Sequence, residues 1–513
     1  MPDTLDRAIL TGLNKQVSAF GLGIFRFAFG LVVFQEIIFL FYFEALIFDP
    51  IPIIEPASPL VSFSLVLWTM ASVCLTVGYK TQLASVCNYC FWVGFLVFTP
   101  LWHDFDGGFD QLMTSTSFLL IFIPSGTSFS IDQIRNKRFL DNNSTSKQIK
   151  PQVSILCYYL PLAISLGLLY FDAGIHKLSA DFWMNGMGAW LPSTMPYYMS
   201  PIDMSPILNI KPVQQLIGYS LVLFQLSFIF LFFYKALRLP LLYFGILFHM
   251  GIIVSLNIYP FGFGMLVHFL LMIPFKWWKK LEHRWQTSID GLSIPTISSN
   301  GIAIPYIYRY NSSKQVLIIR RFLILIMTLQ LNTTLYYGVL GRLEIDTRQN
   351  TPGIIYTLFS NHLTVVSHLF LGITPHALYM DDHFEGYNRI LGITYDSNGA
   401  ENWLPFINRE GRFLTPNWGR VHSMWANVAV RPIMDRQRLE LFSKKVILFW
   451  GTKIGINVEE TEFHIKLKHI QVTDHWVDNL RQFNTKQPWS NAADIAWENN
   501  EFRWTYHKDL FSD

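Results

Sequence analysis

Long apolar runs constrain the fold of this chain more than any other feature of its sequence. The 513 residues contain about nine stretches close to the ~20 residues that an α-helix needs to cross a lipid bilayer. These runs cover residues 18–43, 59–79, 82–101, 108–124, 153–176, 213–235, 238–257, 258–275 and 318–340. Only 15% of the residues are charged, against roughly 25% in an average soluble domain. The sequence therefore predicts a mainly α, polytopic membrane helix bundle that contacts the lipid bilayer, and it argues against a single soluble globule.

The basic residues between these runs indicate how the chain is oriented in the cell membrane. Cytoplasmic loops of a multi-pass protein carry an excess of lysine and arginine. Every second loop of this chain is basic, through Lys80, Arg135, Lys137, Arg138, Lys147, Lys150, Lys235, Arg238, Lys276, Lys279, Lys280 and Arg284. We therefore expect a cytoplasmic N-terminus and, after an odd number of spans, an extracytoplasmic C-terminal third. The net charge is only +3 and the basic residues flank apolar runs, so nucleic-acid binding is not expected.

The C-terminal third has a different composition, with more charge and isolated tryptophans. FHIKLKHIQV alternates apolar and polar residues as a half-buried strand does, LPFINREGRFL has the form of a hairpin, and RQRLELFSKKVILFW has helical spacing. These patterns predict an α+β module. The expected organisation is a transmembrane bundle (1–275), a cytoplasmic linker (276–317), an additional transmembrane helix (318–341) and an extracytoplasmic α+β domain (342–513).

One cluster of ionisable residues falls at the extracytoplasmic ends of the spans. The stretch LLYFDAGIHKLSADFW places Lys177 where the fifth run leaves the membrane, directly after His176. Asp172, His103 and His249 lie at a similar depth. Ionisable groups inside a bilayer cost roughly +2.5 to +3.5 kcal/mol at a helix centre and usually face a bundle interior. The sequence therefore predicts a shared pocket, where desolvation can leave the lysine amine neutral and able to accept a proton.

Other interpretations of these residues stay open. Lys177 could extend its ammonium to the lipid headgroups, and Asp172 with Lys177 or His176 could be an internal ion pair without chemistry. The aromatic connection FWMNGMGAWLPSTMPYYMSP, which contains Trp183, is typical of an interfacial aromatic belt but could also form a lid over the pocket.

Several segments resemble the vitamin K-dependent γ-glutamyl carboxylase and its bacterial relatives, the horizontally transferred transmembrane (HTTM) group. YFDAGIHKLSADFW is similar to the segment that carries the family's catalytic lysine, WHDFDGGFDQLMTSTSFLLIFIP to its histidine segment, and LFHMGIIVSLNIYPFGF to its FH…FP segment. The resemblance covers roughly residues 15–275, and TPHALYMDDHFEGYNRI is similar to a motif that follows the bundle in bacterial members. It implies that Lys177 is the catalytic base and His103 its assistant, and we expect His249, His176, Asp172 and Trp183 to support them or bind substrate.

The resemblance also implies a reaction and its cofactors. The lysine deprotonates vitamin K hydroquinone or another quinol, O2 adds, and the base formed as the quinone becomes an epoxide removes a γ-proton from a glutamate, which captures CO2. The implied partners are a quinone and a glutamate-containing secreted peptide or protein, and no metal is expected. This chain departs from the carboxylase in having His176 where that enzyme has a second lysine and Trp102 where it has an asparagine. These departures weaken carboxylation more than quinone chemistry.

Two rival functions therefore remain. One is a non-enzymatic membrane protein for the export, maturation or immunity of a secreted peptide, and the other is a quinone-linked oxidoreductase that carboxylates nothing. A metal site in TPHALYMDDHF is a further alternative, but its spacing fits no standard zinc pattern and we expect a structural turn. The residues concerned are His376, Asp381, Asp382 and His383.

Overall fold

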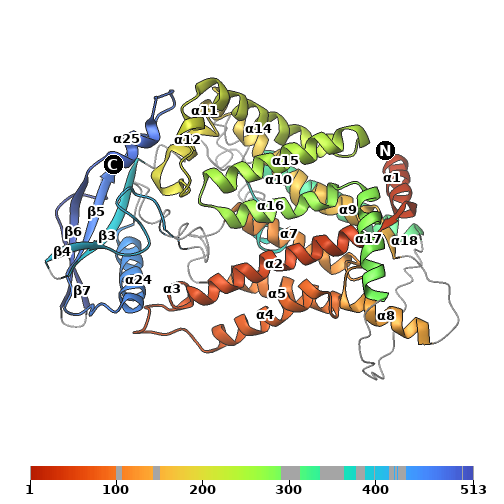
Figure 1. Cartoon of the computed structure of the whole chain (residues 1–513), viewed down its shortest axis with the longest axis horizontal. Coiled ribbons are helices and arrows are strands. Elements are labelled where there is room, and N and C mark those ends of the chain that lie inside the picture. The colour runs from red at the N-terminus through yellow and green to blue at the C-terminus, as the bar shows by residue number, and fades with distance from the viewer. Residues whose placement is uncertain are drawn as a thin grey trace, which may run out of the picture.

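The structure is a computed structural model that places a helical bundle beside a C-terminal β-sheet (Figure 1). It describes residues 2–99, 107–142, 151–290, 312–335, 363–376, 388–397, 399–414, 421, 425, 435–498 and 501–511. The predicted class, a mainly helical membrane bundle followed by a mixed module, is confirmed at this level.

Seven helices in the described residues are long and apolar enough to cross a bilayer. They are α2 (Phe20–Tyr42), α4 (Leu60–Val77), α5 (Thr81–Phe98), the continuous helix of α9 (Leu156–Pro161), η1 (Leu162–Gly167) and α10 (Leu168–Lys177), α14 (Lys211–Leu231), α15 (Lys235–Ser255) and α18 (Ser312–Thr333). An eighth candidate is α16 (Tyr259–Phe269) with η3 (Leu270–Met272), which is followed by α17 (Phe275–Asp290) after a bend of 94°. The total of nine spans stays a prediction.

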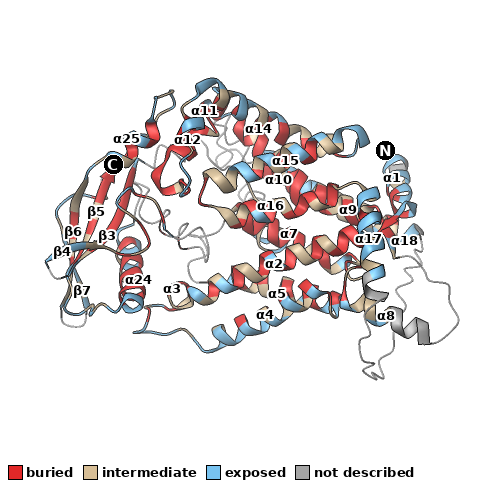
Figure 2. Cartoon of the chain, in the orientation of Figure 1, coloured by how far each residue is buried: buried red, intermediate tan, exposed pale blue. Residues whose placement is uncertain are grey.

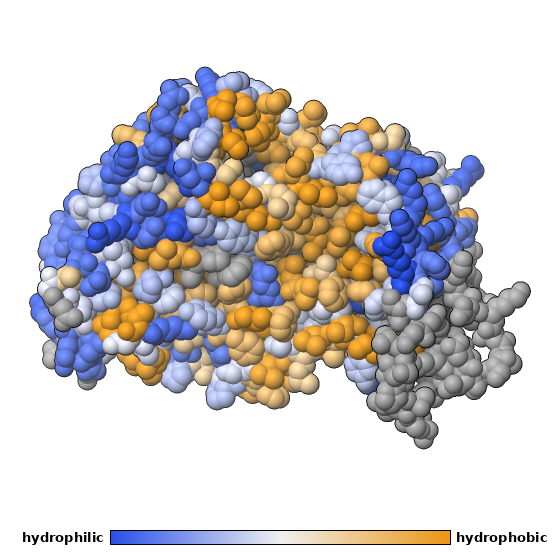
Figure 3. Space-filling view, in the orientation of Figure 1, coloured by the Kyte–Doolittle hydropathy of each residue, from blue (hydrophilic) through white to orange (hydrophobic). Residues whose placement is uncertain are grey.

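The expected fourth span corresponds to α7 (Gly108–Phe122), which has only 15 residues. Its side chains are buried almost all round, including the hydroxyl groups of Thr114, Thr116 and Ser117. Such a helix is enclosed by other helices rather than by lipid. Figure 2 shows the corresponding line of buried residues through the middle of the bundle, and Figure 3 shows hydrophobic side chains covering its visible flank between two hydrophilic ends.

The two ends of the bundle differ in what closes them. At the end that holds the N-terminal helix α1 (Pro2–Asn14), strand β1 (Gln16–Ser18) pairs with β2 (Gln152–Ser154), and α8 (Ile131–Asn142) lies close by (Figure 1). The buried guanidinium of Arg26 connects α2 to the segment after α7, because it donates hydrogen bonds to the carbonyl oxygens of Ser125 (2.9 Å) and Phe129 (2.6 Å). Among the described residues of the expected basic loops, Arg135 of α8 and Lys276 of α17 lie at this end (Figure 1).

The opposite end carries short helices and the C-terminal module. The short helices are α3 (Glu44–Phe48), α11 (Asp181–Met184), α12 (Trp190–Thr194), η2 (Pro196–Tyr198) and α13 (Ser205–Leu208), and α21 (Leu363–Leu371) packs on α7. The module is an antiparallel sheet of order β4-β3-β5-β6-β7 with α24 and α25. Its elements are β3 (Arg389–Ser397), β4 (Ala400–Trp403), α24 (Arg436–Ile454), β5 (Phe463–His469), α25 (Leu480–Lys486), β6 (Trp489–Glu498) and β7 (Glu501–Tyr506).

The local predictions for the module are confirmed. β5 is the strand of FHIKLKHIQV, with Phe463, Ile465 and Leu467 buried in alternation. Residues 406–414 turn back on themselves through an Ile407–Phe413 bridge. α24 is the predicted helix, begun by the side chain of Asp435 and ended by Gly455 at φ 74°.

The module is docked on the bundle through several contacts. Asn257, which follows α15, donates from Nδ2 to the carbonyl oxygen of Phe413 (3.1 Å), and Arg481 of α25 donates to that of Ile202 (3.2 Å). The rings of Trp190 and Trp476 stack with centres 4.8 Å apart. The module therefore lies over the end of the bundle at which α10 ends.

Candidate functional site

Lys177 is the last residue of α10, and its side chain is buried. A short π-helical segment, Leu162–Gly167, precedes α10 and rotates the residues that follow relative to a regular helix. The Lys177 side chain is 5% exposed and donates from Nζ to the carbonyl oxygen of Ala173 at 3.4 Å. Nζ also lies 4.9 Å from the centre of the Trp183 ring, within the range of a cation–π interaction. The lysine is thus enclosed by protein and does not extend to the headgroups.

Asp172 lies on the same helix and is 1% exposed. Its Oδ1 accepts a hydrogen bond from the Thr334 hydroxyl (2.5 Å), and its Oδ2 accepts one from the main-chain N–H of His376 (2.6 Å). Nε2 of His176 lies 3.6 Å from the same Oδ2. The carboxylate is also within electrostatic range of Lys177. The structure therefore brings together four of the predicted residues: Lys177, Asp172, His176 and Trp183.

His376 enters this group from a segment far along the chain. Its Nδ1 lies 3.0 Å from Oε1 of Gln111 on α7, and its ring lies against Gly108, where a Cβ atom would come within 2.2 Å of the imidazole. Burial, and then the nearby charges of Lys177 and His176, lower the pKa of His376 to about 3. His376 is therefore a neutral imidazole at physiological pH.

His249 lies deeper in the bundle than Lys177. It is fully buried, and its Nε2 forms a hydrogen bond with the hydroxyl of Tyr170, seven residues before Lys177 on α10, which is about 10 Å of helix. The rings of Phe248 and Phe261 lie 4.4 and 6.1 Å from the His249 ring. Nδ1 of His249 has no hydrogen-bond partner among the described residues. A buried imidazole nitrogen in an aromatic environment is suited to an oxygen atom of a bound ring.

The predicted assistant His103 lies outside the described residues, as do Asp381, Asp382 and His383 of the proposed alternative metal cluster. Within the described residues, one group has His and carboxylate atoms close enough for a metal: Glu462, His464 and Asp494, all within 4.8 Å. Two of these side chains are engaged with each other on the outer sheet, His464 Nδ1 with Asp494 Oδ1 at 2.7 Å. The expectation of a metal-free site stays a prediction.

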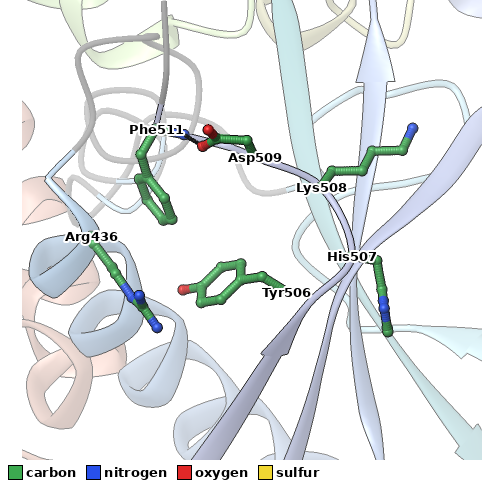
Figure 4. A pocket seen from close by; sticks show the side chains of 6 residues that line it. All are labelled: Arg436, Tyr506, His507, Lys508, Asp509 and Phe511. Carbon is green, nitrogen blue, oxygen red and sulfur yellow. Dashed lines mark hydrogen bonds between the residues drawn. The ribbon is translucent and has the colours of Figure 1, made fainter.

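A cavity of about 340 Å³ lies in the C-terminal module, away from Lys177. In Figure 4, Arg436, Tyr506 and Phe511 face one another across it, while His507 and Lys508 point to the other side of the chain. The Arg436 guanidinium stacks 4.7 Å from the centre of the Tyr506 ring. None of the residues that line this cavity belongs to the buried cluster of Lys177, Asp172, His176 and Trp183.

Sequence reasoning missed three contributors to the buried cluster: Thr334, Gln111 and the main chain of His376. The first two are uncharged polar residues within runs that were predicted as spans, where the sequence does not name their partners. His376 stood out in the sequence only as a metal-ligand candidate, whereas its main-chain N–H makes the contact with Asp172.

Comparison with known proteins gives a match to one family. No curated protein and no solved structure matches the chain. The family model described as the HTTM domain matches residues 14–277, just over half of the chain, and contains α10 and the helices packed around it. HTTM domains are found in vitamin K-dependent carboxylase-like membrane proteins. The chain belongs to the HTTM domain family.

Proposed function

We propose that this chain is a membrane enzyme of the vitamin K-dependent γ-glutamyl carboxylase type, with the amine of Lys177 as the base that takes a proton from a quinol. The proposal rests mainly on the surroundings of Lys177. This lysine is 5% exposed at the end of a membrane span, and it interacts with an indole ring and a carboxylate. Burial favours the neutral amine over the charged ammonium. An amine must be neutral to accept a proton as a base.

The surrounding residues suit the proton transfer. When Lys177 accepts a proton, the face of the Trp183 ring and the carboxylate of Asp172 stabilise the ammonium that forms. The unpartnered Nδ1 of His249, among aromatic rings, fits the oxygen of a membrane quinol. His103 is proposed to assist the base, as the resemblance implies.

The quinol would supply the driving reaction. In the complete reaction the quinol is oxidised to its epoxide, which takes one oxygen atom of O2, and the other oxygen atom leaves as water. A peptide glutamate loses its γ-proton and forms a carbon–carbon bond to CO2. The orientation that the basic loops predict supports this assignment, because a cytoplasmic N-terminus makes the Lys177 end and the C-terminal module extracytoplasmic. A secreted peptide would meet the enzyme there.

The first experiment measures both products from one sample. The full-length protein in detergent is given vitamin K hydroquinone, labelled bicarbonate and a glutamate-containing peptide, as wild type, Lys177→Ala and Lys453→Ala. Lys453 is the matched control, because it also lies over an aromatic ring, that of Tyr42, but on the surface of the module.

We expect wild type and Lys453→Ala to form epoxide and to fix carbon into the peptide, and Lys177→Ala to do neither. Lysine-dependent epoxide without fixed carbon would identify a quinone-linked oxidoreductase and reject carboxylation. Neither product from folded wild-type protein would reject the enzyme and favour a non-enzymatic role in peptide export, maturation or immunity.

A further inference from the structure

We propose that the counter-charge of the Lys177 base is held in place by two segments beyond the HTTM domain. Thr334, just after α18, and the main-chain N–H of His376 are positioning groups that keep the carboxylate of Asp172 ionised. The inference rests on the proposed function only in taking Lys177 as the base.

The hydrogen bonds of Asp172 favour its charged form. A carboxylate that is 1% exposed needs hydrogen bonds or an opposite charge to stay ionised. The N–H of His376 can only donate, so its 2.6 Å bond to Oδ2 stabilises the anion. The Thr334 hydroxyl oxygen accepts from Nε2 of Gln330 (3.1 Å), so its hydrogen is directed to Oδ1 of Asp172. Each carboxylate oxygen thus has its own donor.

The path of the chain before His376 depends on a glycine. Gly372 has φ 65°, in the left-handed region, and a Cβ atom there would lie 2.1 Å from the carbonyl oxygen of Gln111. Only glycine fits this close approach to α7. The turn brings the next residues into the bundle, where the His376 ring lies against Gly108 and bonds Gln111.

The donors to Asp172 affect Lys177 because the Asp172 carboxylate is a negative charge near the Lys177 amine. Lys177 interacts electrostatically with Asp172 on its own helix and with His376 from residues 373–376, and His176 lies beside the same carboxylate. Asp172 supplies the negative charge that favours the ammonium. The HTTM match ends at residue 277, whereas Thr334 and His376 follow it. The domain that supplies the lysine therefore depends on later segments to hold its counter-charge.

The test measures the reactivity of Lys177 rather than turnover. Full-length protein in detergent is treated with a small amine-acylating reagent over a pH series, and mass spectrometry follows the peptide that contains Lys177. Only the neutral amine reacts, so the rate rises with pH to a plateau, and the midpoint reports how strongly the surroundings hold the ammonium. Looser packing raises the plateau, whereas loss of the counter-charge moves the midpoint.

Two variants remove the donors, and each has a matched control. Thr334→Val removes the hydroxyl bonded to Asp172, and Thr328→Val removes one on α18 that bonds only its own helix, at Ile324. Gly372→Ala displaces residues 373–376, and Gly399→Ala imposes the same strain at φ 73°, where no described atom lies within 4 Å of the Cβ position. Asp172→Asn gives the effect of losing the charge entirely.

We expect the midpoint to fall by about one pH unit in Asp172→Asn and by about half a unit in Thr334→Val and Gly372→Ala, with both controls unchanged. A midpoint that stays at the wild-type value in both donor variants, or a raised plateau alone, would overturn the inference. Epoxidation assayed on the same samples separates the two proposals. Shifted midpoints without any epoxide from wild type would sustain this inference while rejecting the enzymatic function.

Discussion

The Nζ atom of Lys177 and the indole ring of Trp183 form a close pair, 4.9 Å apart, at the point where α10 leaves the membrane bundle. The backbone of Gly188 packs directly against the ring, because a Cβ atom there would lie 1.9 Å from Cδ2 of the indole. Trp183 is 4% exposed, so it has no room to move away. The position of the lysine therefore depends on a glycine eleven residues further along the chain.

This arrangement predicts the effect of Gly188→Ala. The added methyl group forces the Trp183 ring toward or away from Lys177, and we expect at least a tenfold loss of Lys177-dependent epoxide formation, about 1.4 kcal/mol. Gly251→Ala is the control, because nothing lies within 4 Å of its Cβ position. Equal activity of the two variants would show that the indole ring has no part in the reaction. The measurement is the initial rate of epoxide formation at saturating quinol.

The hydrogen bond between Tyr170 and His249 gives a second prediction. Tyr170→Phe leaves both nitrogens of a fully buried imidazole without protein partners, which should lower the free energy of unfolding by about 1–3 kcal/mol. Replacing both residues, as Tyr170→Phe with His249→Phe, should recover part of this loss because no unpaired polar group remains. Thermal unfolding in detergent measures both, with Tyr243→Phe on the exposed face of α15 as the control. A double variant less stable than Tyr170→Phe alone would contradict this account.

The sequence predicts contacts in this site only between residues that lie close together along the chain. Lys177, His176, Asp172 and Trp183 fall within one short stretch, in which helical spacing pairs Asp172 with His176. The donors to Asp172 come from 162 and 204 residues away, and no local pattern in the sequence links such positions.

The helices show the same limit. α7 was predicted as a membrane span from its apolar run, but hydropathy cannot distinguish a helix that faces lipid from a 15-residue helix enclosed by its neighbours. In the module, by contrast, β5 and α24 were predicted correctly because the alternation of apolar and polar residues in a strand and the spacing of apolar residues in a helix are local patterns. The order of the strands depends on long-range pairing and could not be derived from those periods.

The buried ammonium of Lys468 provides a prediction for the module. Its Nζ donates to the carbonyl oxygens of Arg409 (3.1 Å), Glu410 (3.2 Å) and Thr485 (2.8 Å), and thereby joins β5 to the 406–414 turn and to α25. Lys468→Met removes all three bonds at a buried position, while the carbonyl oxygen of Arg409 keeps its bond from the Trp489 indole (2.6 Å), so we expect the module to lose about 2–4 kcal/mol of stability.

The control for this variant is Lys466→Met on the same strand, whose ammonium pairs with the half-exposed Glu401 and should contribute less than about 1 kcal/mol. Amide hydrogen exchange of residues 406–414 distinguishes the two variants, because only the loss of Lys468 should increase exchange in the turn. Similar exchange in both would mean that the ammonium does not hold the turn in place.

The last prediction concerns acid stability and follows from Asp494. Partial burial raises the pKa of this carboxyl group, but hydrogen bonds from Asn491, His464 and His507 outweigh it and lower the pKa to about 2, from a usual value of 3.8. A carboxyl group whose pKa is lower in the folded state binds fewer protons there, so its contribution to stability is complete above pH 3.8 and is lost as the pH falls toward 2. Because Asp494 is 26% exposed, solvent screening reduces this contribution to about 1 kcal/mol.

Asp494→Asn should therefore be less stable than wild type at pH 6 and nearly equal to it near pH 2. Hydrogen exchange of β5 and β6 measures this stability, and Asp474→Asn, at an exposed position, is the control. A difference that stays constant across this range would show that the charge of Asp494 is not what stabilises the outer strands.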